Sequence, residues 1–427
     1  EGGHGYKFLF AMAVLAFALF ILDKGIGLLF GMRKSVFFAF LFLFYVTVNY
    51  VINGSTLSEL KAVTIGTTGG MVFAIIIGCT LAYSIDTIYR VSTTSKMYSK
   101  LSGFYTLTTL VLSTVLLYFV LGIHLVSVRS DIFLIEGMLG LYQRPGTFLT
   151  MQMIMLTWLA LSALASGSIS TTVSVVFTLG ILTLASFFMV SISQIVGSNS
   201  GAVSVVALYL ALLLCMFIQK HRLISNKYKI RNSLTELIVL ICKRSILFFT
   251  LLFSVLVLLF IAVDQLDLLD TSSLDRFRIF GFGNGMNSFD SRFTSIRENY
   301  IVQLSYAPIV GNTAVDSLTT GTGTYAHSII LSILTHQGVC GLVLFFLFII
   351  SVYDDIAKSA REPHSRSIYQ GTEMSVIRII LFTLIFVIAI GSTFYTWAPF
   401  WFSAGLLGIQ FSRAANLNKP IRVHAHE

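Results

Sequence analysis

Apolar runs of about twenty residues recur from one end of the chain to the other, and they constrain the fold more than any other feature. An α-helix of about twenty residues crosses the ~30 Å hydrocarbon core of a bilayer. Of the 427 residues, 56% are hydrophobic and 11% are charged, with a mean hydropathy of +0.86. A water-soluble globule would not tolerate so apolar a surface. The sequence therefore predicts an all-α, polytopic integral membrane helical bundle, and the absence of alternation in the runs disfavours a transmembrane barrel.

Eleven candidate spans divide the chain into membrane and loop segments. They cover approximately residues 8–22, 35–52, 62–84, 104–128, 149–165, 170–192, 202–219, 245–263, 327–350, 376–394 and 397–412. Residues 1–263 would hold the first eight helices, 264–326 one large hydrophilic loop, 327–412 the last three helices, and 413–427 a tail.

The basic residues indicate the orientation. Alternating sides along the eleven spans places 20 of the 28 Lys and Arg residues on one side, which the positive-inside rule makes cytoplasmic. The large loop then lies outside. The net charge of +9 comes from short clusters between apolar runs, which is typical of topology signals and does not indicate nucleic-acid binding.

The sequence carries no known cofactor or metal motif. Cys79, Cys215, Cys242 and Cys340 lie in or beside apolar runs without a CxxC spacing, which predicts free core thiols. Walker, HExxH, GxSxG and GxGxxG patterns are also absent.

The large loop contains four arginines against seven acidic residues. A guanidinium group suits bidentate contact with phosphate, so these arginines are candidates for holding a lipid-linked diphosphate. Arg276 and Arg278 flank Asp275 and fit local ion pairs at least as well, whereas Arg292 and Arg297 favour a functional role.

The end of the large loop contains the candidate general base. Residues 297–311 predict a half-buried amphipathic helix that stops at Pro308 before a glycine turn. His327 then falls at the outer end of the next apolar run, where an imidazole suits deprotonation of a sugar hydroxyl; a helix-end histidine bonded to water or headgroups is the alternative. His336 lies nine residues further on and fits a neutral histidine bonded inside the bundle.

A smaller outer loop, residues 129–148, ends in Arg144-Pro145-Gly146 a few residues before the span at 149–165. Arg144 would lie at the depth of the lipid headgroups. Its side chain could bind a phosphate there, or it could simply extend from the helix end to the membrane surface (snorkelling).

Three stretches together resemble the O-antigen polymerase and O-antigen ligase superfamily of bacterial membrane glycosyltransferases, and the polymerases in particular. Residues 327–341 are similar to its pattern of His-Ser, an aliphatic helix and G-x-x-G. Residues 297–311 are similar to its arginine, helix and P-[IL]-x-G segment, and residues 144–148 to its R-P-x-G-x-F entrance. The sequence departs from the family at Ser200, where many members have an arginine before the seventh helix.

The resemblance implies a GT-C-like bundle of 11–12 helices that performs a metal-independent transfer in lipopolysaccharide biosynthesis, without a cofactor. It implies that a glycan moves from an undecaprenyl-diphosphate donor to a sugar hydroxyl of a lipid-linked repeat unit, at the periplasmic face of the bacterial inner membrane. His327 would deprotonate the acceptor, and Arg297, Arg292 and Arg144 would bind the diphosphate. The supporting candidates are Tyr325, Glu298, Asp290 and Asp316. Membrane lipids and a chain-length regulator are the further candidate partners.

Two alternatives stay open. An O-antigen ligase would transfer the polymer to lipid A core, and the residues preceding His327, together with Ser200, favour a polymerase over it. A lipid-linked oligosaccharide flippase should carry short loops and charged groups along a central cavity, whereas this chain gathers its hydrophilic residues in one outer loop.

Overall fold

The computed structural model describes residues 34–52, 68–94, 143–165, 172–195, 199–228, 304–305, 307–312, 328–361, 372–392 and 396–409. Regular structure in these ranges is entirely helical. The chain divides into two compact units, one formed by residues 1–87 with 296–427 and the other by residues 88–295.

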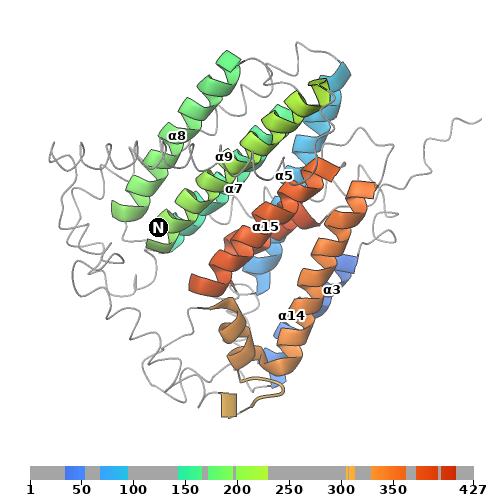
Figure 1. Ribbon diagram of the computed structural model, residues 1–427. Helices are drawn as coiled ribbons and strands as arrows, with labels where there is room; N and C mark the ends of the chain where they lie inside the picture. The colour runs from blue at the N-terminus through green and yellow to red at the C-terminus, as the bar shows by residue number, and fades with distance from the viewer. Residues whose placement is uncertain are drawn as a thin grey trace, which may run out of the picture. The chain divides into compact units, whose positions relative to one another are not determined.

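Seven of the predicted spans coincide with helices (Figure 1). These helices are α3 (Lys34–Ile52), α5 (Gly69–Thr94), α7 (Gln143–Ala165), α8 (Thr172–Ile195), α9 (Asn199–Tyr228), α14 (Ile329–Arg361) and α15 (Thr372–Ser392). The spans predicted at 8–22, 104–128 and 245–263 lie outside the described residues.

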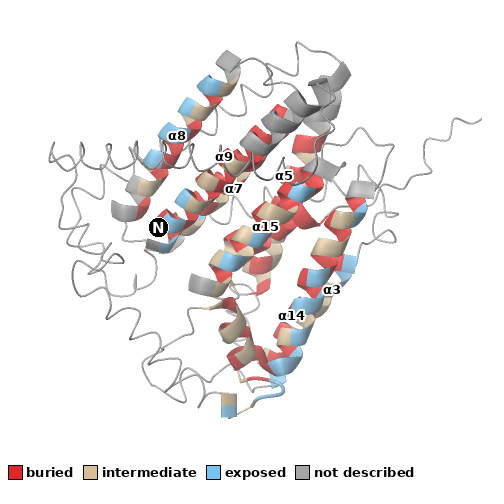
Figure 2. Ribbon diagram, viewed as in Figure 1, coloured by how far each residue is buried: buried red, intermediate tan, exposed pale blue. Residues whose placement is uncertain are grey.

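Four helices of the described part are long and apolar enough to cross a membrane: Lys34–Ile52, Gly69–Asp86, Gly146–Leu164 and Ile329–Ser359. Large apolar side chains remain exposed along α3, α8 and α14. The exposed positions of these helices are pale blue in Figure 2. Such surfaces are typical of helices that face lipid. The total number of crossings and the orientation stay predictions.

The unit of residues 88–295 is built around α7, which packs against α8 and α9. Ser186 of α8 donates to the Met153 sulfur of α7 at 3.7 Å, and the Thr183 and Tyr209 hydroxyls join α8 to α9 at 2.5 Å. α7 is buried over most of its length, whereas α8 exposes Val176 and Phe177. Among the three helices that the structure describes in residues 143–228, α7 is therefore the most buried.

In the other unit, α3 runs antiparallel to α14, because Ser35 contacts Asp355 and Asn49 contacts Gln337. An aromatic cluster fills the space between these two helices, α15 and the short helix α16 (Ala398–Ser403). Trp401 stacks on both Phe42 and Phe348, with ring centroids 5.7 and 5.4 Å apart. Burying such side chains stabilises a fold by about 1.5–3 kcal/mol each in water, and in lipid the gain comes from close packing.

Within the last predicted span, 397–412, the described helical structure begins at Ala398 and ends at Gly408. α16 passes into a π-helical turn, η4 (Ala404–Gly408), so the described helical stretch is about 16 Å long by helical rise and too short to cross a bilayer. A Cβ on Gly405 would clash with the Ile75 carbonyl oxygen, and one on Gly78 with that of Phe402. The apolar run is therefore explained by burial inside this unit.

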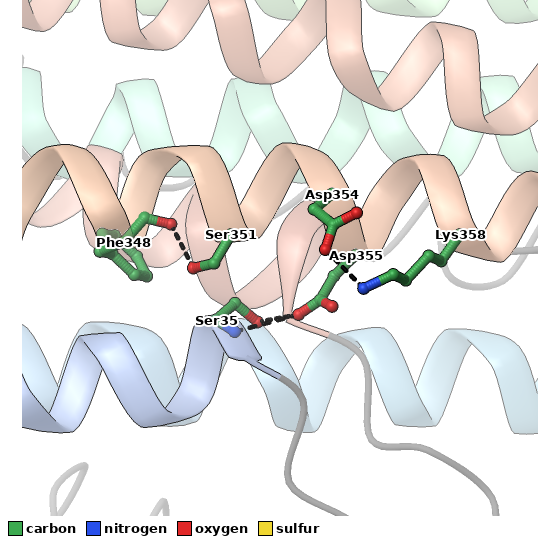
Figure 3. A network of polar contacts seen from close by, with 6 residues as sticks. All are labelled: Ser35, Phe348, Ser351, Asp354, Asp355 and Lys358. Atoms are coloured by element: carbon green, nitrogen blue, oxygen red, sulfur yellow. Dashed lines mark hydrogen bonds and ion pairs between the residues drawn. The ribbon is translucent and has the colours of Figure 1, made fainter.

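Arg378 and Asp355 are buried charged side chains of this unit, and both have polar partners. Arg378 on α15 donates through Nε to the Leu407 carbonyl oxygen at 2.6 Å and through Nη1 to the Ser359 hydroxyl at 2.9 Å. Asp355 on α14 accepts from the Ser35 backbone N–H at 3.1 Å and from its hydroxyl at 2.6 Å (Figure 3). Asp355 thus supplies an acceptor to the first turn of α3, whose N–H groups have no partner within the helix.

We expect Asp355→Ala to lower the melting temperature of the purified protein in detergent, measured by intrinsic fluorescence. The substitution leaves two buried donors of Ser35 without this acceptor, which costs about 1–3 kcal/mol. Asp354→Ala is the matched control, because Asp354 is partly exposed and pairs with Lys358 one turn away, an interaction worth about 0.3–0.5 kcal/mol. Equal melting temperatures for the two variants would contradict the proposed role of Asp355.

Candidate functional site

Seven of the eight predicted site residues lie outside the described residues: His327, Arg297, Arg292, Tyr325, Glu298, Asp290 and Asp316. The eighth, Arg144, belongs to the first turn of α7, which begins at Gln143. The prediction placed Arg144 a few residues before the helix; the helix starts earlier because Pro145 is tolerated in a first turn. The structure describes the residues on either side of 313–327, the last part of the large loop. We call these residues, 307–312 and Ser328 with the start of α14, the framework of the site.

A break in α14 is the central feature of this framework. Gly338 has φ 66° and ψ −171°, a conformation essentially restricted to glycine, and the helix changes direction there (Figure 1). The apolar run 327–350 predicted one continuous helix, because glycine alone within an apolar run does not end a helix.

A second segment of the chain, residues 307–312, occupies the break. Val339 and Cys340 donate their backbone N–H groups to the carbonyl oxygens of Pro308 and Ile309, at 3.0 and 3.1 Å. In a continuous helix these two donors would bond to the carbonyls of Thr335 and His336. The Thr335 carbonyl accepts instead from the Asn312 N–H at 3.1 Å. The segment therefore replaces helical hydrogen bonds with bonds between two chain segments.

Helix α3 also bonds to both segments at the break, through Asn49 and Tyr45. The Asn49 Nδ2 lies 2.9 Å from the carbonyl oxygens of His336 and Val310 and from Oε1 of Gln337. The Tyr45 hydroxyl lies 3.0 Å from the Gln337 carbonyl oxygen and 3.1 Å from that of Val310. One amide and one phenol thus join α3, α14 and the end of the large loop, and they occupy backbone acceptors that the break releases.

Two glycines allow the backbones to approach this closely. Gly311 has φ 78°, and a Cβ on it would clash with the backbone of Gln337 and Gly338. A Cβ on Gly338 would in turn clash with the backbone of Ile309 and Gly311. The glycine turn predicted after Pro308 is confirmed, and its partner across the contact is the first glycine of the GVCG stretch.

His336 lies beside the break and is buried. Its Nδ1 is 2.9 Å from the Ser332 carbonyl oxygen, which can only accept, so Nδ1 carries a proton. This arrangement agrees with the expected histidine bonded within the bundle. The neighbouring Gln337 is fully buried, and its Nε2 has no hydrogen-bond partner in this structure.

Tyr45, Asn49 and Gln337 were not among the residues predicted to form the site. The signal that identifies them is an amide or phenol inside an apolar run, as in YVTVNYVI, because such groups need partners in a membrane. Which partners they find depends on the tertiary contacts. Within the described ranges, no group of three or more His, Cys, Asp or Glu residues could hold a metal ion.

Comparison with protein-family models, with curated proteins and with solved structures finds no match to this chain.

We expect Gly338→Ala and Gly311→Ala each to destabilise the protein. The positive φ alone costs an alanine about 1–3 kcal/mol, and the clash of its Cβ with the facing backbone adds to that cost. The measurement is the melting temperature in detergent together with the amount of protein in the membrane. Gly180→Ala is the control, because Gly180 lies within α8 and a Cβ there meets no atom within 4 Å. This control should be neutral or stabilising by about 0.5–1 kcal/mol, and an equal loss in all three variants would contradict the account of the break.

Proposed function

We propose that this protein is an O-antigen polymerase that elongates a lipid-linked polysaccharide at the periplasmic face of the bacterial inner membrane. The observation that carries the proposal is the contact between residues 308–311 and residues 337–340. These are two of the three stretches in which the sequence resembles the polymerase and ligase superfamily. Residues that are distant in sequence and similar to family motifs thus form one structural unit.

This contact bears on the candidate chemistry through the chain between the two stretches. Asn312 is bonded to Thr335, and Ser328 directly precedes α14, so the ends of the 15-residue segment 313–327 lie about 10 Å apart along the helix. Asp316, Tyr325 and His327 all belong to this segment. A catalytic group gains effectiveness from a fixed position relative to its substrate, and the described residues on either side of this segment, Asn312 and Ser328, are both bonded to α14.

In the proposed reaction, His327 removes the proton from the attacking sugar hydroxyl as its oxygen bonds to the anomeric carbon of the donor. The bond from that carbon to the diphosphate breaks, and undecaprenyl diphosphate leaves. Arg297, Arg292 and Arg144 bind the diphosphate and stabilise the charge that develops on it. Arginine side chains supply this positive charge without a metal ion.

A transporter is the second candidate, because transporters often bind substrates at broken membrane helices. Such sites use free N–H groups at the start of a half-helix. Here the Val339 and Cys340 N–H groups already donate to Pro308 and Ile309. The break is therefore filled by the protein's own backbone, which favours the enzyme over the transporter.

We expect His327→Ala and Arg297→Ala to abolish polysaccharide elongation in a strain that lacks the native gene. Loss of a general base typically costs 10²–10⁴-fold in rate, enough to leave lipid A core with a single repeat unit. The measurement is the polysaccharide ladder on a gel at matched membrane levels of each variant. Lys358→Ala, which removes an exposed cation at the other end of α14, should keep the ladder.

Other outcomes of this experiment exclude parts of the proposal. Polymer that stays on its lipid carrier without reaching lipid A core would identify a ligase. An unchanged ladder for His327→Ala would exclude His327 as the base. Elongation of purified lipid-linked repeat units by reconstituted protein would exclude a transporter, since transport forms no glycosidic bond.

A further inference from the structure

The segment Pro308–Val310 exposes apolar side chains beside the break in α14. Ile309 is 67% exposed and Val310 is 45% exposed, although both belong to a loop that is hydrophilic in composition. Ile309 and its neighbour Pro308 are bonded through their carbonyls to Cys340 and Val339. The exposed residues of the loop therefore adjoin the surface of α14.

The adjoining surface of α14 is an apolar stripe. Val339, Val343, Phe346 and Ile350 are all exposed, and their spacing of three and four residues places them on one face of the helix. Figure 2 shows the exposed positions continuing from the loop onto this part of α14. Ile309 extends the stripe beyond the helix itself.

The register of α3 gives the depth of this surface. Ser35 and Asn49 are separated by about 21 Å of helical rise, and α3 as a whole is about 28 Å long, close to the hydrocarbon thickness of a bilayer. Asn49, which contacts Val310, is three residues from the end of α3. The residues beyond it, Val51 and Ile52, are 54% and 69% exposed, so the apolar surroundings extend at least to that end of the helix.

The backbone of the segment also fits a nonpolar environment. Irregular backbone is tolerated at membrane depth only where its polar groups are paired within the protein. The carbonyls of residues 307–310 all accept hydrogen bonds, from Gly311, Val339, Cys340 and the side chains of Tyr45 and Asn49. An aqueous loop would have no need for such pairing.

We propose that Pro308–Val310 is a re-entrant segment of the large loop, embedded in the outer leaflet with Ile309 in contact with lipid acyl chains. This inference goes beyond the enzymatic proposal and shares with it only the predicted orientation of the chain. The large loop would not be wholly periplasmic, as its composition predicts, but would return into the membrane before α14.

Site-specific fluorescence quenching tests the proposal. In full-length protein whose four cysteines are replaced, Ile309→Cys, Val343→Cys and Lys358→Cys would each carry one environment-sensitive fluorophore in vesicles of phosphatidylethanolamine and phosphatidylglycerol. Spin-labelled acyl chains should quench the label at residue 309 at least half as strongly as the label at residue 343. Aqueous iodide should quench the label at residue 358 at least threefold more strongly than the label at residue 309.

Two results would overturn the proposal. Strong quenching of residue 309 by iodide would place the segment in water, and protection from both quenchers would mean that another part of the protein or a second copy covers it. Each labelled variant is first checked for the melting temperature of the cysteine-free parent. Because the readout involves no glycosyl transfer, an inactive enzyme with a lipid-accessible Ile309 would refute only the enzymatic proposal.

Discussion

The hydrogen bonds that replace the helical ladder at Gly338 are the interaction on which the rest of the described framework depends. In water, a broken helix can bond its released groups to solvent, but in hydrocarbon each unpaired group costs several kcal/mol. The break in α14 is therefore possible only because Pro308, Ile309 and Asn312 supply matching partners. In the same way, the segment 307–312 is held against α14 only because α14 is broken there. Neither irregularity is stable without the other.

Helix α3 fixes this pair of irregular segments relative to the remainder of the unit. Its first turn is bonded to Asp355 and its last turns to Val310 and Gln337, so both ends of the α3 and α14 pair carry directional contacts. Between them, Phe42 packs against Phe345 and Trp401 without directional bonds. A shift of one helical turn would still bury aromatic rings, but it would leave the buried polar groups at both ends unpaired. The polar contacts thus select the register, while the aromatic cluster contributes most of the packing.

Hydropathy located the helices but not the break, for a physical reason. The hydropathy of a membrane span is summed over about twenty residues, so a span is recognised even when individual residues are ambiguous. The break at Gly338 depends on one positive φ and on a partner about thirty residues upstream, which no local pattern contains. Pro308 and Gly311 were recognisable as a turn because proline and glycine act locally. Asn49 was visible as an amide in an apolar run, but its three acceptors come from two other segments. The apolar run at 397–412 is buried over residues 399–409, and burial inside the protein and exposure to lipid select the same residue types.

The same framework limits how the proposed chemistry can be organised. Because Val339 and Cys340 donate their N–H groups to the protein's own carbonyls, these two groups are not available at the break to neutralise a diphosphate. The proposed reaction takes its positive charge from side chains instead, and arginine provides it with fixed geometry and without a titration near neutral pH. Histidine is the complementary choice for the proton, since its ordinary pKa of about 6.5 allows it to accept one and release it. The membrane explains why the helix break and the charged residues have separate roles in the proposed reaction. Backbone groups at the break must be paired within the protein, because hydrocarbon offers them no other partner. Charges that bind substrate are best placed at the membrane boundary, where they remain hydrated.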